Sequence, residues 1–463
     1  MPWPMKRKVA PYQENSITEG VIWKNLLSFF FPILLGTFFQ QMYNTVDAII
    51  VGKFVGKEAL AAVGGTTGTI INLIVGFFVG LSSGATVILS QYYGGRKYKE
   101  VSDTVHTATA MAIGGGLLIM VLGLALSPAM LRLLDTPEEL IDYSLSYIRI
   151  YFIGMVPSLI YNIGSGLLRA VGDSRRPLLF LIVACLTNII LDVVFVVGFE
   201  MHVAGAALAT ILSQAASAAL LIITLMRSHT AYRLEVKKIR FHGPLLKRII
   251  TIGLPAGLQS MAYSVSNAIV QASINGFGTN VMAAYTAYGK LDAFNWMLQN
   301  AFGVSITTFV GQNFGAQKYD RVKKSVRVCL AMTAGGTLLL SAFLLIAGKP
   351  LYHMFTDDAH VIEIGMQMLW QLAPVYILYV CIEVLSGALR GTGDALMPSV
   401  LTLTGVCLLR VIWLLGVVPF NRTLNMVLFC YPLTWTVTSL LFVVYYVKGG
   451  WLKRSIRKAG LEG

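Results

Sequence analysis

The chain has 463 residues, of which 56% are hydrophobic and only 13% are charged, and its mean hydropathy is +0.69. This composition leaves too little polar side-chain area for a water-soluble protein of this length, which excludes a soluble enzyme or binding domain. A formal net charge of +14 would favour a nucleic-acid ligand in a soluble chain. Here lysine and arginine stand in short segments between long apolar runs, so we expect no nucleic-acid partner.

Twelve apolar runs follow one another, each long enough to cross about 30 Å of hydrocarbon, which takes about 20 helical residues. Short alternating segments typical of a membrane barrel are missing from the sequence. We therefore predict an all-α polytopic membrane protein. The predicted spans are 25–51, 58–91, 101–126, 140–165, 177–199, 203–226, 248–274, 281–312, 325–347, 361–388, 398–418 and 424–448.

The first span carries one carboxyl group, Asp47, near its outer end. Gln40, Asn44 and Asp47 have the spacing i, i+4, i+7, which places them on one face of a helix. An ionisable group inside a membrane helix is costly, so it marks a functional site. Pro32 is expected to kink this helix, because it lacks an N–H group and its ring crowds the preceding turn. The kink is a predicted hinge that responds to the charge on Asp47.

The fifth span carries a second acid, Asp192, with Asn188 one turn earlier. Thr210 on the next span is expected at a similar depth, and Asp47 and Asp192 each follow a proline by fifteen residues. The first half of the chain holds no clearly buried base to pair with these acids. Their oxygen atoms could hold Na⁺, or a carboxyl group could carry H⁺. We expect a coupling-ion site here, with no organic cofactor and no resident metal centre.

The second half holds two acids and two bases within its spans, Lys290, Asp292, Glu383 and Arg410. We expect these four to form permanent ion pairs that hold the C-terminal half together, a functional charge network being the alternative. Five aromatic residues are expected to line a cavity and bind flat cations, although aromatic residues also face lipid or pack. They are Tyr43, Tyr161, Tyr263, Tyr288 and Trp296.

The two halves of the chain repeat each other. GSGLLRAVGDSRRP (164–177) aligns with LSGALRGTGDALMP (385–398) at an offset of 221, and SQYYGGRKY (90–98) aligns with GQNFGAQKY (311–319) at the same offset. Six spans per half give both halves the same orientation, so we predict two six-helix bundles related by a parallel repeat around a cavity. The bundles are expected at 1–227 and 248–463, joined by a cytoplasmic linker at 228–247. Arg169 and Asp173, like Arg390 and Asp394, are expected to bond and close a turn.

Lysine and arginine alternate between the two sides of the predicted spans. They gather in the N-terminal tail (6–8 and Lys24) and at 96–99, 227–248, 318–327 and 448–458, whereas Asp135, Glu138, Asp357 and Asp358 stand in intervening loops. By the positive-inside rule both termini are cytoplasmic. Compact loops favour a multi-pass protein of the bacterial cytoplasmic membrane, and we expect a monomer in the lipid bilayer.

Over about residues 20–450 the chain resembles a multidrug and toxic compound extrusion (MATE) transporter. The matching residues are VDxxxVG (46–52), the QYYGG and QNFGA loops, the paired LRxxGD loops, and NxxLD followed by GAALAT (188–210). The resemblance implies two bundles in a V shape that alternate access and export cationic or amphipathic compounds by H⁺ or Na⁺ antiport. Asp47, Asn188, Asp192, Thr210 and Pro32 match the acidic site of the DinF-like branch. The NorM-like branch has carboxylates where this chain has Tyr263 and Tyr379.

We therefore expect a cation-coupled antiporter whose substrate competes with the coupling ion, and not an enzyme. One alternative is a lipid-linked oligosaccharide flippase of the same superfamily, whose cavity would present basic residues such as Lys290 and Arg410 to a diphosphate. A passive channel is a further alternative, but no filter-like motif is present. A membrane-embedded enzyme is disfavoured, because no nucleophile–base pair or metal-ligand cluster stands out in the sequence.

Overall fold

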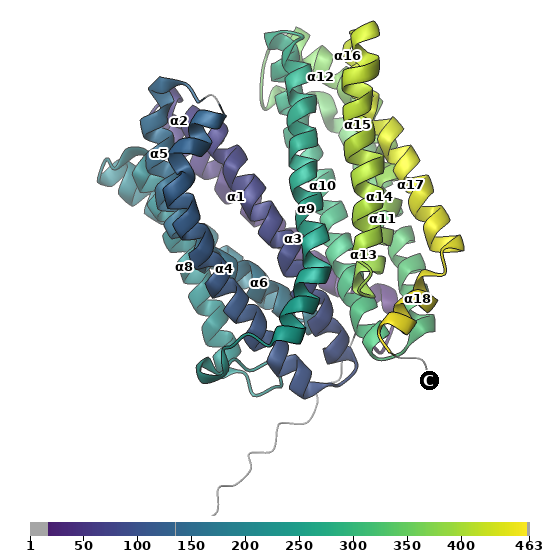
Figure 1. The fold of residues 1–463 in the computed structure, drawn as a ribbon. Helices are drawn as coiled ribbons and strands as arrows, with labels where there is room; N and C mark the ends of the chain where they lie inside the picture. The colour runs from purple at the N-terminus through teal and green to yellow at the C-terminus, as the bar shows by residue number, and fades with distance from the viewer. Residues whose placement is uncertain (1–16, 135, 461–463) are drawn as a thin grey trace, which may run out of the picture.

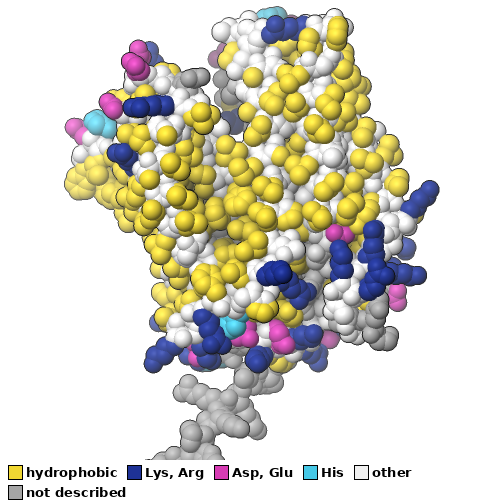
Figure 2. Space-filling model, viewed as in Figure 1, with side chains coloured by type: hydrophobic (Ala, Val, Ile, Leu, Met, Phe, Trp, Pro, Cys, Tyr) yellow, Lys and Arg dark blue, Asp and Glu magenta, His cyan; other side chains and the backbone are white. Residues whose placement is uncertain are grey.

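The computed structural model describes residues 17–134 and 136–460, which are helical and contain no strand. The basic residues 6–8 and Asp135, expected on opposite sides of the membrane, lie outside the described residues. The helices form two bundles that diverge toward the top of Figure 1 and meet toward the bottom. A broad apolar band covers the middle of the visible face, and charged side chains gather toward its ends (Figure 2). This distribution fits a protein that spans a bilayer.

Six helical segments make up the first half of the chain, and several of them are broken. They are α1 (Ile22–Phe54), α2 (Lys57–Gly64) with α3 (Thr66–Gly94), α4 (Tyr98–Leu133), α5 (Glu138–Ile153) with α6 (Met155–Ala170), α7 (Arg175–Asp192) continued by the π-helical η1 (Val193–Gly198), and α8 (His202–Arg227). The linker that follows holds one short turn, η2 (Val236–Lys238).

The second half repeats this order and adds a short helix at its end. Its elements are α9 (Gly243–Asn275), α10 (Thr279–Gly315), α11 (Tyr319–His353), α12 (Ala359–Leu372), η3 (Ala373–Val375), α13 (Tyr376–Gly391), α14 (Leu396–Thr402), η4 (Leu403–Leu408), α15 (Leu409–Ile412), η5 (Trp413–Val417), η6 (Val418–Phe420), α16 (Leu424–Leu428), α17 (Cys430–Lys448) and α18 (Trp451–Lys458).

Each predicted span corresponds to one of these continuous or broken helices. Within the described residues, nine segments are long and apolar enough to cross a membrane, and the pair α5 and α6, bent by 53°, makes a tenth. The other two are α9 and α10, which are long enough but more polar. Both lie at the centre of the molecule and line its cavity, which explains why their composition is less apolar.

The internal repeat extends to the backbone conformation of its turns. Gly172 and Gly393, the glycines of the paired LRxxGD loops, have φ of +96° and +91°. In a second pair of turns, Arg96 and Gln317 are equivalent to each other and have φ of 57° and 58°. A positive φ is strained for a residue with a β-carbon, which explains glycine in both LRxxGD turns. The repeat seen in the sequence is therefore a repeat of structure.

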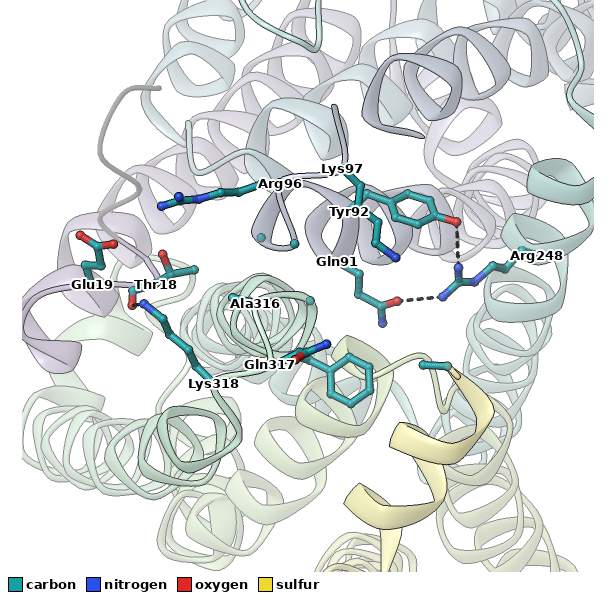
Figure 3. A pocket seen from close by; sticks show the side chains of 15 residues that line it. Thr18, Glu19, Gln91, Tyr92, Arg96, Lys97, Arg248, Ala316, Gln317 and Lys318 are labelled. Carbon is teal, nitrogen blue, oxygen red and sulfur yellow. Dashed lines mark hydrogen bonds between the residues drawn. The ribbon is translucent and has the colours of Figure 1, made fainter. Parts of the chain in front are cut away.

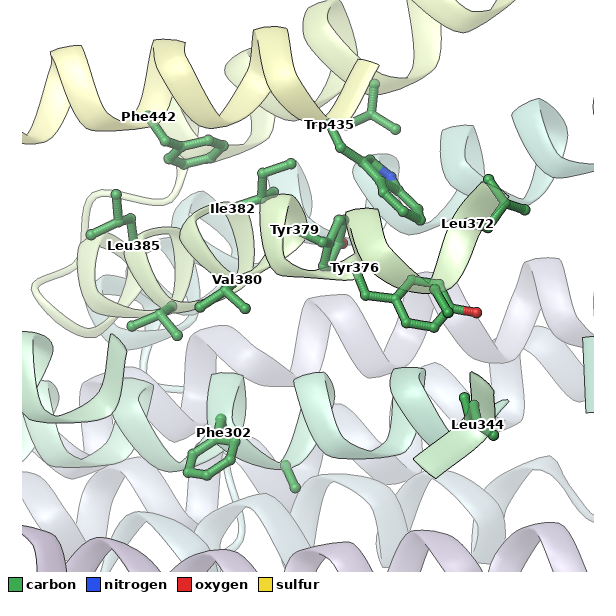
Figure 4. Packing of buried hydrophobic residues seen from close by; sticks show 14 of the residues in the cluster. Phe302, Leu344, Leu372, Tyr376, Tyr379, Val380, Ile382, Leu385, Trp435 and Phe442 are labelled. Atoms are coloured by element: carbon green, nitrogen blue, oxygen red, sulfur yellow. The ribbon is translucent and has the colours of Figure 1, made fainter. Parts of the chain in front are cut away.

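Two hydrophobic cores stabilise the molecule, one in each bundle. In the second, Trp435 of α17 lies over Tyr376 and Tyr379 of α13 (Figure 4). The N-terminal parts of α1 and α9 each pack against the opposite bundle. Leu26 of α1 belongs to the core of the second bundle, and Ile249 of α9 belongs to the core of the first. This exchange ties the bundles together at the end where the loops rich in lysine and arginine lie.

The bundles meet along glycine-rich helix faces. A β-carbon on Gly80 of α3 would stand 2.5 Å from the amide nitrogen of Gly257 in α9, and one on Gly84 would stand 2.2 Å from the Ile249 carbonyl oxygen. Glycine is therefore what allows these backbones to touch. At the bottom of this contact Arg248 donates to Tyr92 (2.9 Å) and to Gln91 (3.0 Å), as Figure 3 shows. We call this the closed end.

Candidate functional site

A cavity lies between the two bundles above the closed end. Its two adjoining parts measure about 550 and 420 Å³. They share five lining residues, namely Val79, Arg169, Trp296, Asn300 and Val304. We call the two parts together the central cavity. Its walls come from both bundles, so its shape depends on how the bundles lie relative to each other.

The two acids of the first bundle lie in the protein interior. Asp47 is 8% exposed and Asp192 is fully buried, and the two are close enough for their charges to interact. Asn188, one turn before Asp192, is also fully buried. Both oxygens of Asp192, Asp47 Oδ1 and both amide atoms of Asn188 have no hydrogen-bond partner among the described residues. We call Asp47 and Asp192 the acidic pair.

Tyrosines lie between the two bundles' cavity and the first core, close to the acidic pair. Tyr43 and Tyr151 line the cavity, whereas neither acid does. Tyr43 and the buried Tyr147 both lie within electrostatic reach of Asp47. Thr210, whose hydroxyl donates to the Ala206 carbonyl at 3.0 Å, lies against Tyr147. The acidic pair therefore lies beside the cavity without lining it. Tyr43 was predicted from the sequence as a cavity residue, whereas sequence reasoning missed Tyr147 and Tyr151.

The remaining residues of the predicted coupling site are spread out. Gln40 faces the central cavity and Pro32 lines it, inside a continuous α1. Asn44 is exposed, and no hydrogen bond links Asp47 to Gln40 or Asn44 in the described part of the chain. The continuous helix places the three residues within about 60° of one another, as their spacing predicts. Asn44 lines neither part of the central cavity, so its place in the coupling site stays a prediction.

The four charges of the second bundle do not form the expected ion pairs. No ion pair in the described residues joins Lys290, Asp292, Glu383 or Arg410. Lys290 is exposed, because two residues of helix turn it away from Asp292. Asp292 accepts a hydrogen bond from Trp296 Nε1 at 2.8 Å. Neutral donors thus replace the predicted base.

Arg410 is buried within the second bundle. It is 1% exposed, donates to Asn267 Oδ1 at 2.8 Å, and lies 4.7 Å from the centre of the Tyr431 ring. It does not line the central cavity, whereas Glu383 does. The four charges of the predicted network therefore lie in four separate places, and only Glu383 lines the cavity.

Four of the five predicted cavity aromatics line the central cavity: Tyr43, Tyr161, Tyr263 and Trp296. Tyr288 is a correction, because it is buried in the second core and its hydroxyl bonds to Tyr376 at 2.8 Å. Tyr288 and Trp296 are eight residues apart on α10 and differ in direction by about 80°. That rotation is enough to place one in the core and the other in the cavity.

The cavity also holds two residues that the sequence assigned to turns. Arg169 and Arg390, expected to bond Asp173 and Asp394, instead line the cavity. Asp173 pairs with Arg176 at 3.3 Å, and Asp394 accepts from Tyr445 at 2.8 Å. The arginines stand on the last turns of α6 and α13, and the acids beyond the turns. Arg169 and Arg390 occupy equivalent positions in the two halves of the repeat, and this equivalence was the sequence signal that could have predicted them as a pair of cavity residues.

This geometry provides two kinds of chemistry. A buried carboxylate without a partner is stable only when it is protonated or binds a cation, so the acidic pair can take up a cation. The central cavity combines aromatic side chains with a few charged and amide groups, which is typical of a site for an amphipathic small molecule. Tyr43 lines the cavity and lies within electrostatic reach of Asp47, so it connects the two sites.

The MatE family model matches residues 32–194 and 255–414, one match in each half. The chain is 30% identical to Probable multidrug resistance protein YpnP of Bacillus subtilis, over 85% of this chain and 88% of that protein. It is 21% identical to Multidrug export protein MepA of Staphylococcus aureus, over 89% of this chain and 90% of that protein.

Solved structures share the same fold. A multidrug resistance MATE family transporter of the MOP superfamily in an outward-facing conformation has a TM-score of 0.87 at 20% identity, covering 96% of this chain and 99% of that chain. A MOP superfamily transporter from Pyrococcus furiosus, described by the reversed polarity of its binding pocket, has a TM-score of 0.88 at 22% identity, with the same coverage. The chain belongs to the MATE family of multi-pass membrane transporters.

Proposed function

We propose that this chain is an H⁺- or Na⁺-coupled antiporter that exports amphipathic small molecules by alternating access. The observation that carries the proposal is the acidic pair, two buried carboxyl groups without hydrogen-bond partners beside the cavity. The names of its multidrug relatives support export of drug-like compounds. Tyrosines at positions 263 and 379, together with the acids at 47 and 192, favour the DinF-like branch.

The basic loops favour a cytoplasmic location for the closed end and both termini, in a bacterial cytoplasmic membrane. The central cavity then opens outward. H⁺ or Na⁺ entering from outside neutralises Asp47, which removes a charge from near Tyr43 and Tyr147. Because α1 carries both Asp47 and Pro32, the helix bends at the proline and narrows the cavity, so the substrate leaves. No cofactor is needed, and a monomer suffices.

The alternative of a lipid-linked oligosaccharide flippase required Lys290 and Arg410 to face the cavity. Lys290 is exposed and Arg410 is buried against Asn267 and Tyr431, and neither lines the cavity. The two bases that the sequence suggested for a diphosphate therefore lie outside the cavity, although Arg169 and Arg390 line it. The antiporter is the better supported function because of the buried acidic pair and the multidrug relatives.

The proposal is tested with everted membrane vesicles and a fluorescent amphipathic dye, with an imposed pH gradient and an imposed Na⁺ gradient measured separately. The wild type should move the dye under one of the two gradients, and Asp47→Asn should not. Asp142→Asn, which alters an exposed acid of α5, is the matched control and should behave like the wild type. Dye movement that persists in Asp47→Asn would refute coupling through the acidic pair. Folded wild type that responds to neither gradient would favour a lipid substrate.

A further inference from the structure

We propose that the substrates of this transporter carry an anionic group, a carboxylate or phosphate on an aromatic amphiphile, and that Arg169 and Arg390 bind it. This narrows the substrate class of the central cavity and rests on the exporter function proposed above. It narrows the expectation of a cationic or amphipathic substrate, which the family resemblance implied.

The first argument is the charge balance of the cavity. Among its described lining residues the charged ones are Arg169, Arg390 and Glu383, two cations against one anion. Asp47 and Asp192, the acids that would attract a cation, are buried and do not line the cavity. A substrate in the cavity therefore meets a net positive field.

The second argument is that neither arginine forms an ion pair among the described residues, although Glu383 lies within electrostatic reach of Arg390. Arg169 Nε is buried without a hydrogen-bond partner in the described part of the chain. The Nε and Nη2 atoms of Arg390 both donate to the Ser386 hydroxyl, at 3.1 and 2.5 Å. No ion pair in the described residues includes either arginine. A guanidinium group inside a membrane protein without an anion is costly, and a bidentate carboxylate or phosphate removes that cost.

The third argument is position. Arg169 and Arg390 are repeat-equivalent and enter the cavity from opposite bundles, each on the last turn before a glycine turn. Hydroxyl groups surround them, from Thr86 and Thr307 on the cavity wall. Trp296 contributes an aromatic face to the same cavity. An anion between the arginines thus leaves the apolar part of the molecule against the aromatic residues above.

The test uses rhodamine B, a zwitterion at neutral pH, and rhodamine B ethyl ester, in which the same chromophore is a cation. Binding to the purified full chain in lipid nanodiscs is followed by fluorescence anisotropy, without any ion gradient. The wild type should bind rhodamine B more tightly than the ester. Arg169→Gln and Arg390→Gln should each weaken rhodamine B binding by about tenfold, the effect of one lost charge-assisted bond. Binding of the cationic ester should stay unchanged or tighten, because each variant removes a positive charge from the cavity.

Controls separate this proposal from general damage. Arg175→Gln, an exposed arginine of the same loop, should bind both dyes like the wild type. If Arg169→Gln does not fold, Arg169→Lys keeps the charge and should retain the preference for rhodamine B. Glu383→Gln removes the only acid among the described lining residues and should tighten rhodamine B binding. A cavity built for cations would instead lose ester affinity in that variant.

Two outcomes overturn the proposal: equal or weaker wild-type binding of rhodamine B relative to the ester, or an equal loss of both dyes in the arginine variants. Asp47→Asn should keep the wild-type dye preference, because Asp47 does not line the cavity. If Asp47→Asn binds both dyes like the wild type but does not export them, its defect lies in ion coupling and not in substrate recognition. Failure of coupling and failure of the anion site therefore give different results.

Discussion

Gln91 and Gln312 hold the two bundles together by the same bond made twice. Gln91 Nε2 donates to the Gly391 carbonyl at 2.9 Å, and Gln312 Nε2 donates to the Ala170 carbonyl at 2.6 Å. Both pairs are related by the offset of 221 residues, and both side chains are buried. At the closed end below the cavity, Gln91 thus bonds the end of α13, which carries Arg390. Gln312 bonds the end of α6, which carries Arg169. These two hydrogen bonds, one from each of the QYYGG and QNFGA loops, join the bundles, and we call them the latch.

Removing both glutamines should open the closed end. Each buried hydrogen bond contributes about 1 kcal/mol, so Gln91→Ala combined with Gln312→Ala should shift the balance of conformations by about thirtyfold. Spin labels at positions 99 and 323, in a cysteine-free background, should show a population with a longer separation. Gln371→Ala, which removes a bond to Asn425 within one bundle, is the control. An unchanged distance distribution in the double variant would exclude the latch.

Pro32→Ala should impair export without harming the fold. Proline in a helix interior lacks a donor and costs about 3 kcal/mol, so alanine straightens and stabilises α1. If bending at this position transmits the charge state of Asp47, dye export should fall to the level of Asp47→Asn. Thermal unfolding of the purified variant should occur at the wild-type temperature or above. Full export activity in Pro32→Ala would show that the hinge lies elsewhere.

Asp192→Asn should not destabilise the protein. The carboxyl group is fully buried and makes no hydrogen bond to the described residues, so an amide that cannot ionise avoids a desolvation penalty on the order of 1 kcal/mol. Asp358→Ala gives the contrast, because Asp358 caps α12 by accepting from His360 N and Val361 N. Losing such a cap costs about 1 kcal/mol. Equal destabilisation of the two variants would mean that Asp192 is structural.

Arg410→Gln should destabilise the second bundle and leave substrate selectivity intact. The substitution removes a charged hydrogen bond to Asn267 and a cation–π contact with Tyr431, together about 2 kcal/mol. Reversible unfolding in mixed micelles measures the loss. The ratio of rhodamine B to ester affinity should match that of the wild type, unlike Arg390→Gln. A changed ratio would place Arg410 in contact with the substrate.

Much of the fold could be predicted from the sequence, because a bilayer constrains a chain strongly. The thickness of the hydrocarbon sets the length of each apolar run, and backbone groups inside it must be satisfied by helices. The twelve spans and the repeat follow from these rules, and the paired glycines at 172 and 393 mark turns of positive φ. The burial of Asp47 and Asp192 follows from their depth in apolar runs.

The partners of the charged residues could not be predicted in the same way. The sequence by itself determined the class, the spans, the repeat and the depth of each charge, since these depend on local composition and helix rise. Only the tertiary structure decided that the two acids do not line the cavity, that Arg410 bonds Asn267, and that Arg169 and Arg390 line the cavity. The direction in which a helix face points is set by packing against other helices, and residues far apart in the chain supply the neighbours.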